Sequence, residues 1–235
     1  MAVTPSFDDI VALSLRDPER FWGDASNAVD WYEPWSRVLD DSRAPFYRWF
    51  AGGVMNTCHN ALDRHVDSGR GEQVALIYDS PVTDTVARYS YRELRDAVAR
   101  CAGVLRAQGL GRGDRAVIYM PMIPEAVIAM LACARLGAVH SVVFGGFAPK
   151  ELASRIDDAK PAAVVSASCG VEGGRVIPYK PLLDQALAAA EHEVSRCIVL
   201  QRPQVAAELV PDRDVSWRDA VAAAEPHACV PVRAT

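Results

Sequence analysis

From residue 115 onward, short runs of β-branched residues alternate with longer stretches whose apolar positions recur at helical spacing. Continuous apolar runs indicate strands buried on both faces, and apolar residues three and four apart indicate helices packed on a sheet. The repeated strand–helix–strand spacing predicts an α/β fold with a mostly parallel sheet, flanked by helices and joined by right-handed crossovers. The predicted order is strand 115–120, helix 125–136, strand 139–144, helix 149–159, strand 162–167, helix 181–190 and strand 197–200.

Upstream of this alternation the pattern changes twice. Two strand-like runs, 74–78 and 86–89, flank a loop with proline and aspartate and predict a β-hairpin. Ser90, followed three residues later by Glu93, is a capping box, and the apolar stripe behind it predicts a helix that ends before the glycine-rich loop 109–114. That loop follows a helix and precedes a strand, the reverse of a phosphate-binding turn, so we interpret it as a simple connection.

Residues 1–50 are crowded with aromatic side chains, including four of the five tryptophans, interrupted by prolines and acids. Aromatic clusters can stack nucleic-acid bases, but basic residues are not interleaved here, so packing is the favoured interpretation. The pattern therefore predicts an aromatic-rich, mainly helical extension over 1–70 and an α/β subdomain over 71–200. A proline-rich, incomplete tail with one short helix follows over 201–235.

The composition, 50% hydrophobic and 23% charged over 235 residues, is typical of a globular protein. The net charge of −5 argues against nucleic-acid binding, which needs a basic face, but does not exclude an anionic small molecule. The longest apolar run, 126–134, is far shorter than the ~20 residues that span a bilayer, and the first residues do not resemble a signal peptide. We therefore expect a cytoplasmic protein that does not bind membranes.

The six cysteines are scattered without any Cys-x-x-Cys pair, which is typical of a reduced protein without a disulfide framework. Cys58 and His59 with His65 are the nearest metal-ligand candidates, but their spacing fits no standard site, so we expect no bound metal. Asp63, Arg64 and His65 stand in a row like a catalytic relay. Adjacent helical residues point in different directions, however, which favours a solvated or salt-bridged helix.

The chemically most suggestive stretch is 139–180, in which two predicted strands each end in a glycine-bearing loop. The carboxyl ends of parallel strands meet at one sheet edge, where open α/β sheets bind their ligands. The first loop offers an aromatic face, Phe144, beside two glycines, Gly145 and Gly146, that let the backbone approach a ligand. This combination suits a partly aromatic ligand.

The second loop carries Gly173 and Gly174 followed by Arg175, a flexible turn with a planar cation suited to a phosphate. Lys180 is close in sequence, and Arg155 and Lys160 are further candidate cations. Two interpretations stay open from these residues alone. One is a site for a nucleotide-like anion, and the other is two tight turns with an exposed arginine.

Several segments, taken together, resemble the short-chain acyl-CoA synthetases, the acetyl- and propionyl-CoA synthetase branch of the adenylate-forming enzymes. Two motifs are most similar to those of propionyl-CoA synthetases. They are Asn-Thr-Cys-His-Asn-Ala-Leu-Asp-Arg-His at 56–65 and Tyr-Lys-Pro-Leu-Leu-Asp at 179–184. The resemblance covers nearly the whole chain, in order. The segments that carry it are 52–66, 125–137, 143–160 and 170–184.

The resemblance implies that the chain is part of the large N-terminal domain of an adenylate-forming enzyme. It also implies a two-step reaction: ATP and propionate or acetate give an acyl-adenylate and pyrophosphate, and CoA then gives acyl-CoA and AMP. The nucleotide end of CoA would be held at seven positions, with the last four at its 3′-phosphate. Glu172 departs from the acetyl enzymes, which commonly carry arginine there, so Arg175 would bind that phosphate alone. The seven positions are Phe144, Gly145, Gly146, Glu172, Gly173, Gly174 and Arg175.

The resemblance further implies that the family's Ser/Thr/Gly-rich phosphate loop, carboxylate pocket and mobile domain with the catalytic lysine follow residue 235. No Walker-type phosphate loop occurs in residues 1–235. We therefore assign no catalytic residue to this chain and expect it to be inactive alone, with ATP and magnesium bound only by the intact enzyme. The alternative is a truncated, non-catalytic CoA- or nucleotide-binding or regulatory module. A nicotinamide-dependent oxidoreductase is disfavoured because no Gly-x-Gly-x-x-Gly follows a strand.

Overall fold

The computed structural model describes residues 6–234, which divide into two compact units. The larger unit is Thr57–Val230, and the smaller unit holds the described residues up to Asn56 and from Pro231 onward. These units divide the chain at other points than the sequence-based division into 1–70, 71–200 and 201–235. The reason is packing: the helical segment that begins at Thr57 and the helix near residue 220 both contact the helix that starts at Tyr91.

The larger unit is built on a five-stranded parallel sheet in the order β12–β11–β8–β6–β7. This confirms the predicted mostly parallel sheet. The strands β7 and β8, which flank the helix of the 139–180 stretch, are not neighbours, because β6 lies between them. The strands are β6 (Arg115–Met120), β7 (Val139–Phe144), β8 (Ala163–Ala167), β11 (Cys197–Leu200) and β12 (Asp214–Ser216).

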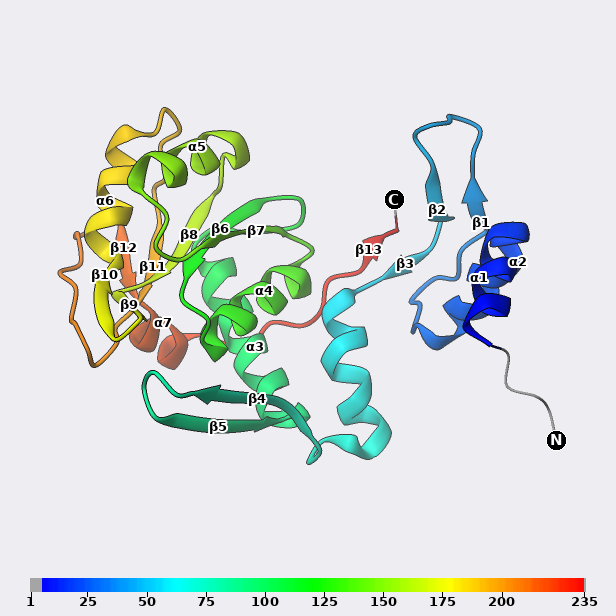
Figure 1. Ribbon diagram of the computed structural model, residues 1–235, viewed down its shortest axis with the longest axis horizontal. Helices are drawn as coiled ribbons and strands as arrows, with labels where there is room; N and C mark the ends of the chain where they lie inside the picture. Colours follow the sequence, from blue (N-terminus) through cyan, green and yellow to red (C-terminus); the bar gives the residue numbers. More distant parts are fainter. Residues whose placement is uncertain (1–5, 235) are drawn as a thin grey trace. The chain divides into compact units, whose positions relative to one another are not determined.

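Helices cover both faces of this sheet (Figure 1). One face carries α3 (Tyr91–Ala107), α4 (Pro124–Leu136) and α7 (Trp217–Ala223), and the other carries α5 (Pro149–Ala159) and α6 (Tyr179–Ala189). Alternate side chains of β6, β8 and β11 enter opposite cores, as the period of two requires. On β6, for example, Ile118 packs with Leu105 in one core, while Tyr119 packs with Leu183 in the other.

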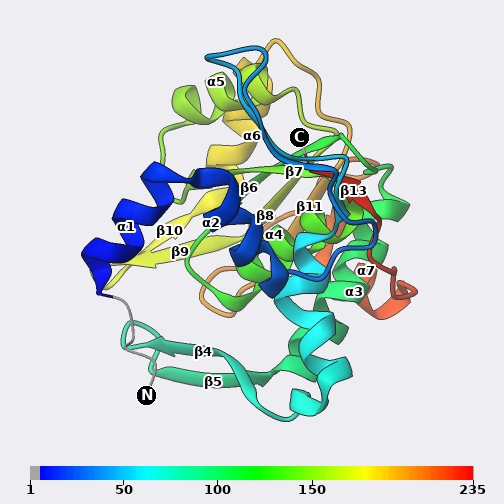
Figure 2. The same ribbon diagram turned by 90° about the vertical axis from the view of Figure 1, so that its right-hand side faces the viewer.

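Two antiparallel hairpins extend from this body. The predicted hairpin is present as β4 (Val74–Ser80) and β5 (Thr85–Ser90), a two-stranded ribbon that packs along α3 (Figure 2). The predicted capping box at the start of α3 is confirmed. The second hairpin, β9 (Cys169–Glu172) and β10 (Arg175–Pro178), replaces the plain glycine loop expected after β8.

Residues 57–70 form one helical segment that includes the π-helical turns η2 (His59–Asp63) and η3 (Val66–Arg70). The C-terminal part of the larger unit, residues 224–230, runs over α3 and α4. A Cβ atom at Gly103 of α3 would overlap the backbone carbonyl oxygen of Glu225, so only glycine lets this segment approach the helix.

The smaller unit contains short elements and most of the aromatic residues. The indole nitrogens of Trp31 and Trp35 donate to the carbonyl and the hydroxyl of Ser26, at 3.1 and 3.0 Å. This supports packing for those two rings, whereas Phe7 and Phe46 are exposed. The elements are α1 (Phe7–Arg16), α2 (Pro18–Ala25), η1 (Ser26–Ala28), β1 (Arg37–Asp40), β2 (Arg48–Ala51), β3 (Val54–Met55) and β13 (Val232–Arg233).

Across residues 6–234, no helix has the combined length and apolar character that crossing a lipid bilayer requires.

Candidate functional site

A cleft of about 570 Å³ opens where β6 and β7 end. Its walls come from the turn between β4 and β5, the loop after β6, the end of β7 and the β9–β10 hairpin. The cleft therefore lies at the carboxyl edge of the parallel sheet, the position at which open α/β sheets bind ligands. Four of the residues singled out from the sequence line it: Phe144, Gly145, Glu172 and Gly173.

Phe144 is the last residue of β7, and 66% of its surface is exposed. Its ring lies 5.8 Å from the ring of Phe147, in a tilted arrangement. The carbonyl of Phe147 accepts a hydrogen bond from the Tyr119 hydroxyl at 3.2 Å, which ties the loop after β7 to the core. An aromatic face is thus held at the cleft on an anchored loop.

Tyr179, the first residue of α6, organises this part of the cleft, and sequence reasoning missed it. Its side chain is buried, and its ring stacks on Tyr119 at a centroid distance of 4.9 Å. Cβ atoms built at Gly145 and Gly170 would both overlap the Tyr179 hydroxyl. The two glycines are therefore needed because a tyrosine is wedged between their backbones, an approach that no sequence spacing reveals.

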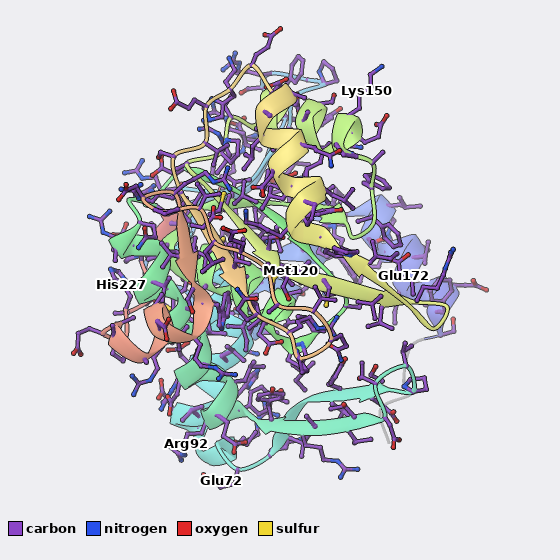
Figure 3. All side chains as sticks on the ribbon, turned by 90° about the vertical axis from the view of Figure 1, so that its left-hand side faces the viewer. Glu72, Arg92, Met120, Lys150, Glu172 and His227 are labelled. Carbon is purple, nitrogen blue, oxygen red and sulfur yellow. The ribbon has the colours of Figure 1, made fainter. Side chains whose placement is uncertain are left out.

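The Tyr179 hydroxyl donates a hydrogen bond to Glu172 Oε1 at 3.1 Å. Burial, followed by this bond to the carboxylate and its charge, raises the pKa of Tyr179, so the hydroxyl keeps its proton and stays a donor. Glu172 lies near the tip of the β9–β10 hairpin (Figure 3), close to the backbone of Gly146. The carboxylate at the cleft is therefore held in place.

The turn of this hairpin is the glycine pair predicted from the sequence. Gly173 and Gly174 have φ angles of +54° and +78°, and two successive positive φ angles are typical of the tight turns that connect antiparallel strands. The register places Glu172 and Arg175 directly opposite each other across the two strands. Side chains in such positions share one face of the hairpin. Arg175 and Gly174 lie next to the cleft wall rather than on it.

The expectation that Lys180 adds free positive charge at this site is wrong. Its side chain is buried, and its ammonium group pairs with Asp184 at 2.6 Å and with Asp214 at 2.9 Å. Arg155 and Lys160 do not line the cleft, whereas Arg202, after β11, does. The guanidinium of Arg202 donates to the Cys169 carbonyl at 3.0 Å. No local pattern indicates Arg202 as a site residue, because it follows a strand in a proline-rich loop.

Asp63, Arg64 and His65 diverge, as expected for adjacent helical positions. Asp63 pairs with Arg135 of α4 at 2.7 Å, and the His65 ring lies 4.7 Å from the ring of Tyr91. The interpretation as a salt-bridged helix is confirmed. The three metal-ligand candidates from the sequence, Cys58, His59 and His65, do not form a cluster of potential metal ligands. Instead, the potential ligand atoms of Cys58, Asp63 and Cys229 lie within 4.8 Å of one another.

Comparison with known proteins places this chain in a family. Residues 62–232 match the AMP-binding enzymes, and the chain belongs to that family. Residues 7–61 match the acetyl-coenzyme A synthetase N-terminus. Both matches confirm the resemblance inferred from the sequence.

Two relatives indicate which branch of the family this chain resembles most. The chain is 50% identical over 222 residues to the human mitochondrial acyl-CoA synthetase short-chain family member 3, covering 94% of this chain and 32% of that protein. It is 46% identical over 212 residues to the propionate–CoA ligase of Salmonella typhimurium, covering 90% and 34%. This chain thus spans about a third of the length of these relatives.

A solved structure supports the fold. The acetoacetyl-CoA synthetase from Streptomyces lividans superposes with a TM-score of 0.86 and 26% sequence identity. The match covers 98% of this chain and 35% of that one. The prediction that these residues fold as part of the large N-terminal domain of an adenylate-forming enzyme is confirmed.

Proposed function

We propose that this chain is the N-terminal part of an ATP-dependent short-chain acyl-CoA synthetase. The complete enzyme would convert propionate or acetate, ATP and CoA into acyl-CoA, AMP and pyrophosphate through an acyl-adenylate, with magnesium accompanying ATP. The identity to a propionate–CoA ligase and to a short-chain acyl-CoA synthetase supports this reaction. Propionate is the favoured carboxylate because the motifs at 56–65 and 179–184 resemble those of propionyl-CoA synthetases.

The contribution of this chain would be one wall of the CoA site. The observation that carries the proposal is the cleft at the carboxyl edge of the sheet, with Phe144, Gly145 and Glu172 on its wall. The exposed Phe144 ring can stack on the adenine base of CoA, next to Gly145 and Gly146, whose Cβ positions are taken up by Tyr179 and Glu172.

The phosphate end of the same ligand would lie at the tip of the β9–β10 hairpin. Arg175 is exposed there, and a guanidinium can bind a phosphate through two parallel hydrogen bonds. The Glu172 carboxylate, held by Tyr179, repels a phosphate at the same tip. Arg175 would therefore carry this contact without a second cation from position 172.

Replacing Arg175 by alanine is expected to weaken binding of CoA by about 10- to 150-fold. A lost charge-assisted hydrogen bond costs roughly 1.5–3 kcal/mol, which corresponds to that range. Isothermal titration of the 235-residue chain with CoA, at several salt concentrations, measures the effect. The reciprocal variant Glu172→Gln should bind CoA more tightly than the wild type, since a like charge beside the phosphate is removed.

Two comparisons make this titration decisive. Arg112→Ala removes an exposed arginine from the turn between α3 and β6, away from the cleft lining, and should leave the affinity unchanged. Titration with dephospho-CoA, which lacks the 3′-phosphate, should show little difference between wild type and Arg175→Ala. Equal affinity of the wild type and Arg175→Ala for CoA would refute the role of Arg175. Absence of any CoA binding by the wild type would refute the proposed site.

We also expect the 235 residues alone to form no acyl-CoA. The chain spans about a third of its relatives, 32% and 34% of their lengths, and we assign it no catalytic residue. Incubation with ATP, magnesium, propionate or acetate, and CoA, followed by chromatographic detection of acyl-CoA, measures this. Detectable product that disappears in the Arg175→Ala variant would show that a complete active site is present in these residues.

A cytoplasmic location and small-molecule partners complete the proposal. The six cysteines carry thiols, which suits a reducing compartment. The net charge of −5 does not suit binding to nucleic acid.

A further inference from the structure

Away from the cleft, two cysteines far apart in sequence meet inside the larger unit. Cys58, near the start of the helical segment 57–70, is completely buried, and Cys229, in the C-terminal segment, is partly exposed. Their sulfur atoms and a carboxylate oxygen of Asp63 lie within 4.8 Å of one another. The proposed CoA site uses none of these groups.

A buried guanidinium organises this group. Arg135 donates to both oxygens of Asp63, at 2.7 and 3.0 Å, and to the Cys58 sulfur at 3.5 Å. The Cys229 thiol donates to Asp63 Oδ2 at 3.6 Å. One sulfur therefore faces a positive donor, while the other faces a negative acceptor.

These surroundings shift the pKa values of the two thiols in opposite directions. Contact with the Cys229 thiol lowers the pKa of Cys58 against the opposing effect of burial, and Arg135 lowers it further. The same contact, together with burial, raises the pKa of Cys229. Of the two sulfurs, Cys58 therefore loses its proton more readily, and the accessible Cys229 keeps its own.

A metal ion is the competing occupant, since two cysteines and an aspartate are suitable zinc ligands. The guanidinium of Arg135 already contacts two of these three groups, Asp63 and Cys58, and its positive charge would repel a metal cation. The arrangement is better suited to sulfur chemistry than to metal binding.

We propose that Cys58 and Cys229 form a redox-active thiol pair that hydrogen peroxide converts reversibly into a disulfide. The Cys58 sulfur, beside the Arg135 guanidinium, attacks the peroxide as a thiolate and gives a sulfenic acid and one water. The Cys229 sulfur then attacks the Cys58 sulfur, forms the S–S bond and releases the hydroxyl group, with the second proton, as another water. Overall, two thiols and one peroxide give one disulfide and two waters, and a dithiol reductant reverses the change.

The disulfide would fasten the first turn of the segment 57–70 to the last residues of the larger unit, whose limits are Thr57 and Val230. Closing so long a loop restricts the unfolded chain strongly. Oxidation is therefore expected to raise the melting temperature of the chain.

The test is treatment of the 235-residue chain with hydrogen peroxide, followed by intact-mass measurement and peptide mapping without reduction. The expected result is the loss of two hydrogen atoms, a Cys58–Cys229 linked peptide, a higher melting temperature, and full reversal by dithiothreitol. Cys101 and Cys133 are an internal control: they are buried, and burial raises the pKa of each. They should stay reduced under the same conditions.

Two variants separate the steps. In Cys229→Ser, Cys58 should be trapped as a sulfenic acid that a dimedone probe labels, and no disulfide should form. In Cys58→Ser, Cys229 should keep its proton and resist the peroxide. Retention of all thiols in folded wild type, or a disulfide between other cysteines, overturns the proposal. So does stoichiometric zinc binding that both serine variants abolish. The peptide map of the wild type decides the question even where a variant fails to fold.

Discussion

Replacing Asp63 by alanine is expected to lower the free energy of unfolding by about 3–5 kcal/mol, since it leaves a buried charge without its partner. The side chain of Arg135 is only 7% exposed and that of Asp63 17% exposed. Two hydrogen bonds join them, so this is a well-aligned charge pair. Urea denaturation followed by circular dichroism measures the loss.

The double variant Asp63→Ala with Arg135→Met should recover much of that stability, because it removes the stranded charge together with its partner. The exposed pair of Arg92 and Glu72 (Figure 3) is a matched control. Its side chains are 50% and 84% exposed, and surface pairs contribute only about 0–1 kcal/mol. If Asp63→Ala changed stability no more than Arg92→Ala does, the structural importance of the buried pair would be disproved.

Replacing Asp214 by asparagine should also destabilise the protein, by about 1–3 kcal/mol near neutral pH, because Lys180 and Arg213 then share Asp184 as their remaining carboxylate partner. The Asp214 side chain is fully buried and accepts from Arg213 at 2.7 Å and from Lys180 at 2.9 Å. The backbone N–H of Val210 donates a third bond, at 2.8 Å. Denaturant titrations of the wild type and the variant measure the difference.

The same variant should flatten the dependence of stability on acidic pH. Burial raises the pKa of Asp214, but hydrogen bonds from Arg213, Val210 and Lys180 outweigh it, so the pKa in the folded protein is lower than usual. The folded state then binds fewer protons than the unfolded state. The stabilisation is present above the unfolded pKa of about 3.9 and is lost as the pH falls through the folded pKa. Asp158→Asn, at an exposed position of α5, should leave the profile unchanged.

Much of the fold followed from the pattern of apolar residues. The strands 115–120, 139–144 and 197–200 were predicted at the bounds that the structure shows, because each is rich in β-branched and other apolar residues and is closed by a turn. The β9–β10 hairpin was predicted only as a glycine loop. Its strands are four residues each, too short to show a period, and only their pairing reveals them.

The site followed from the sequence less completely. The glycines and Phe144 were recognisable because an exposed aromatic and a flexible backbone have local signatures. The role of Tyr179 was not, since it depends on backbones at Gly145 and Gly170 that only the folded sheet brings together. Lys180, on helix α6, was misjudged for a similar reason, because one of its two partners, Asp214, lies on strand β12, far along the chain.

Gly103, on α3, is a glycine because the C-terminal segment 224–230 packs directly against it. In an exposed helix, glycine at position 103 would be an obvious target for engineering, since alanine there usually adds about 1 kcal/mol of stability. Here the added methyl group would strike the carbonyl of Glu225 and lift the C-terminal segment away from α3. A designer who reads only local helix propensity would loosen the protein at this residue, and any stabilised version must leave it as it is.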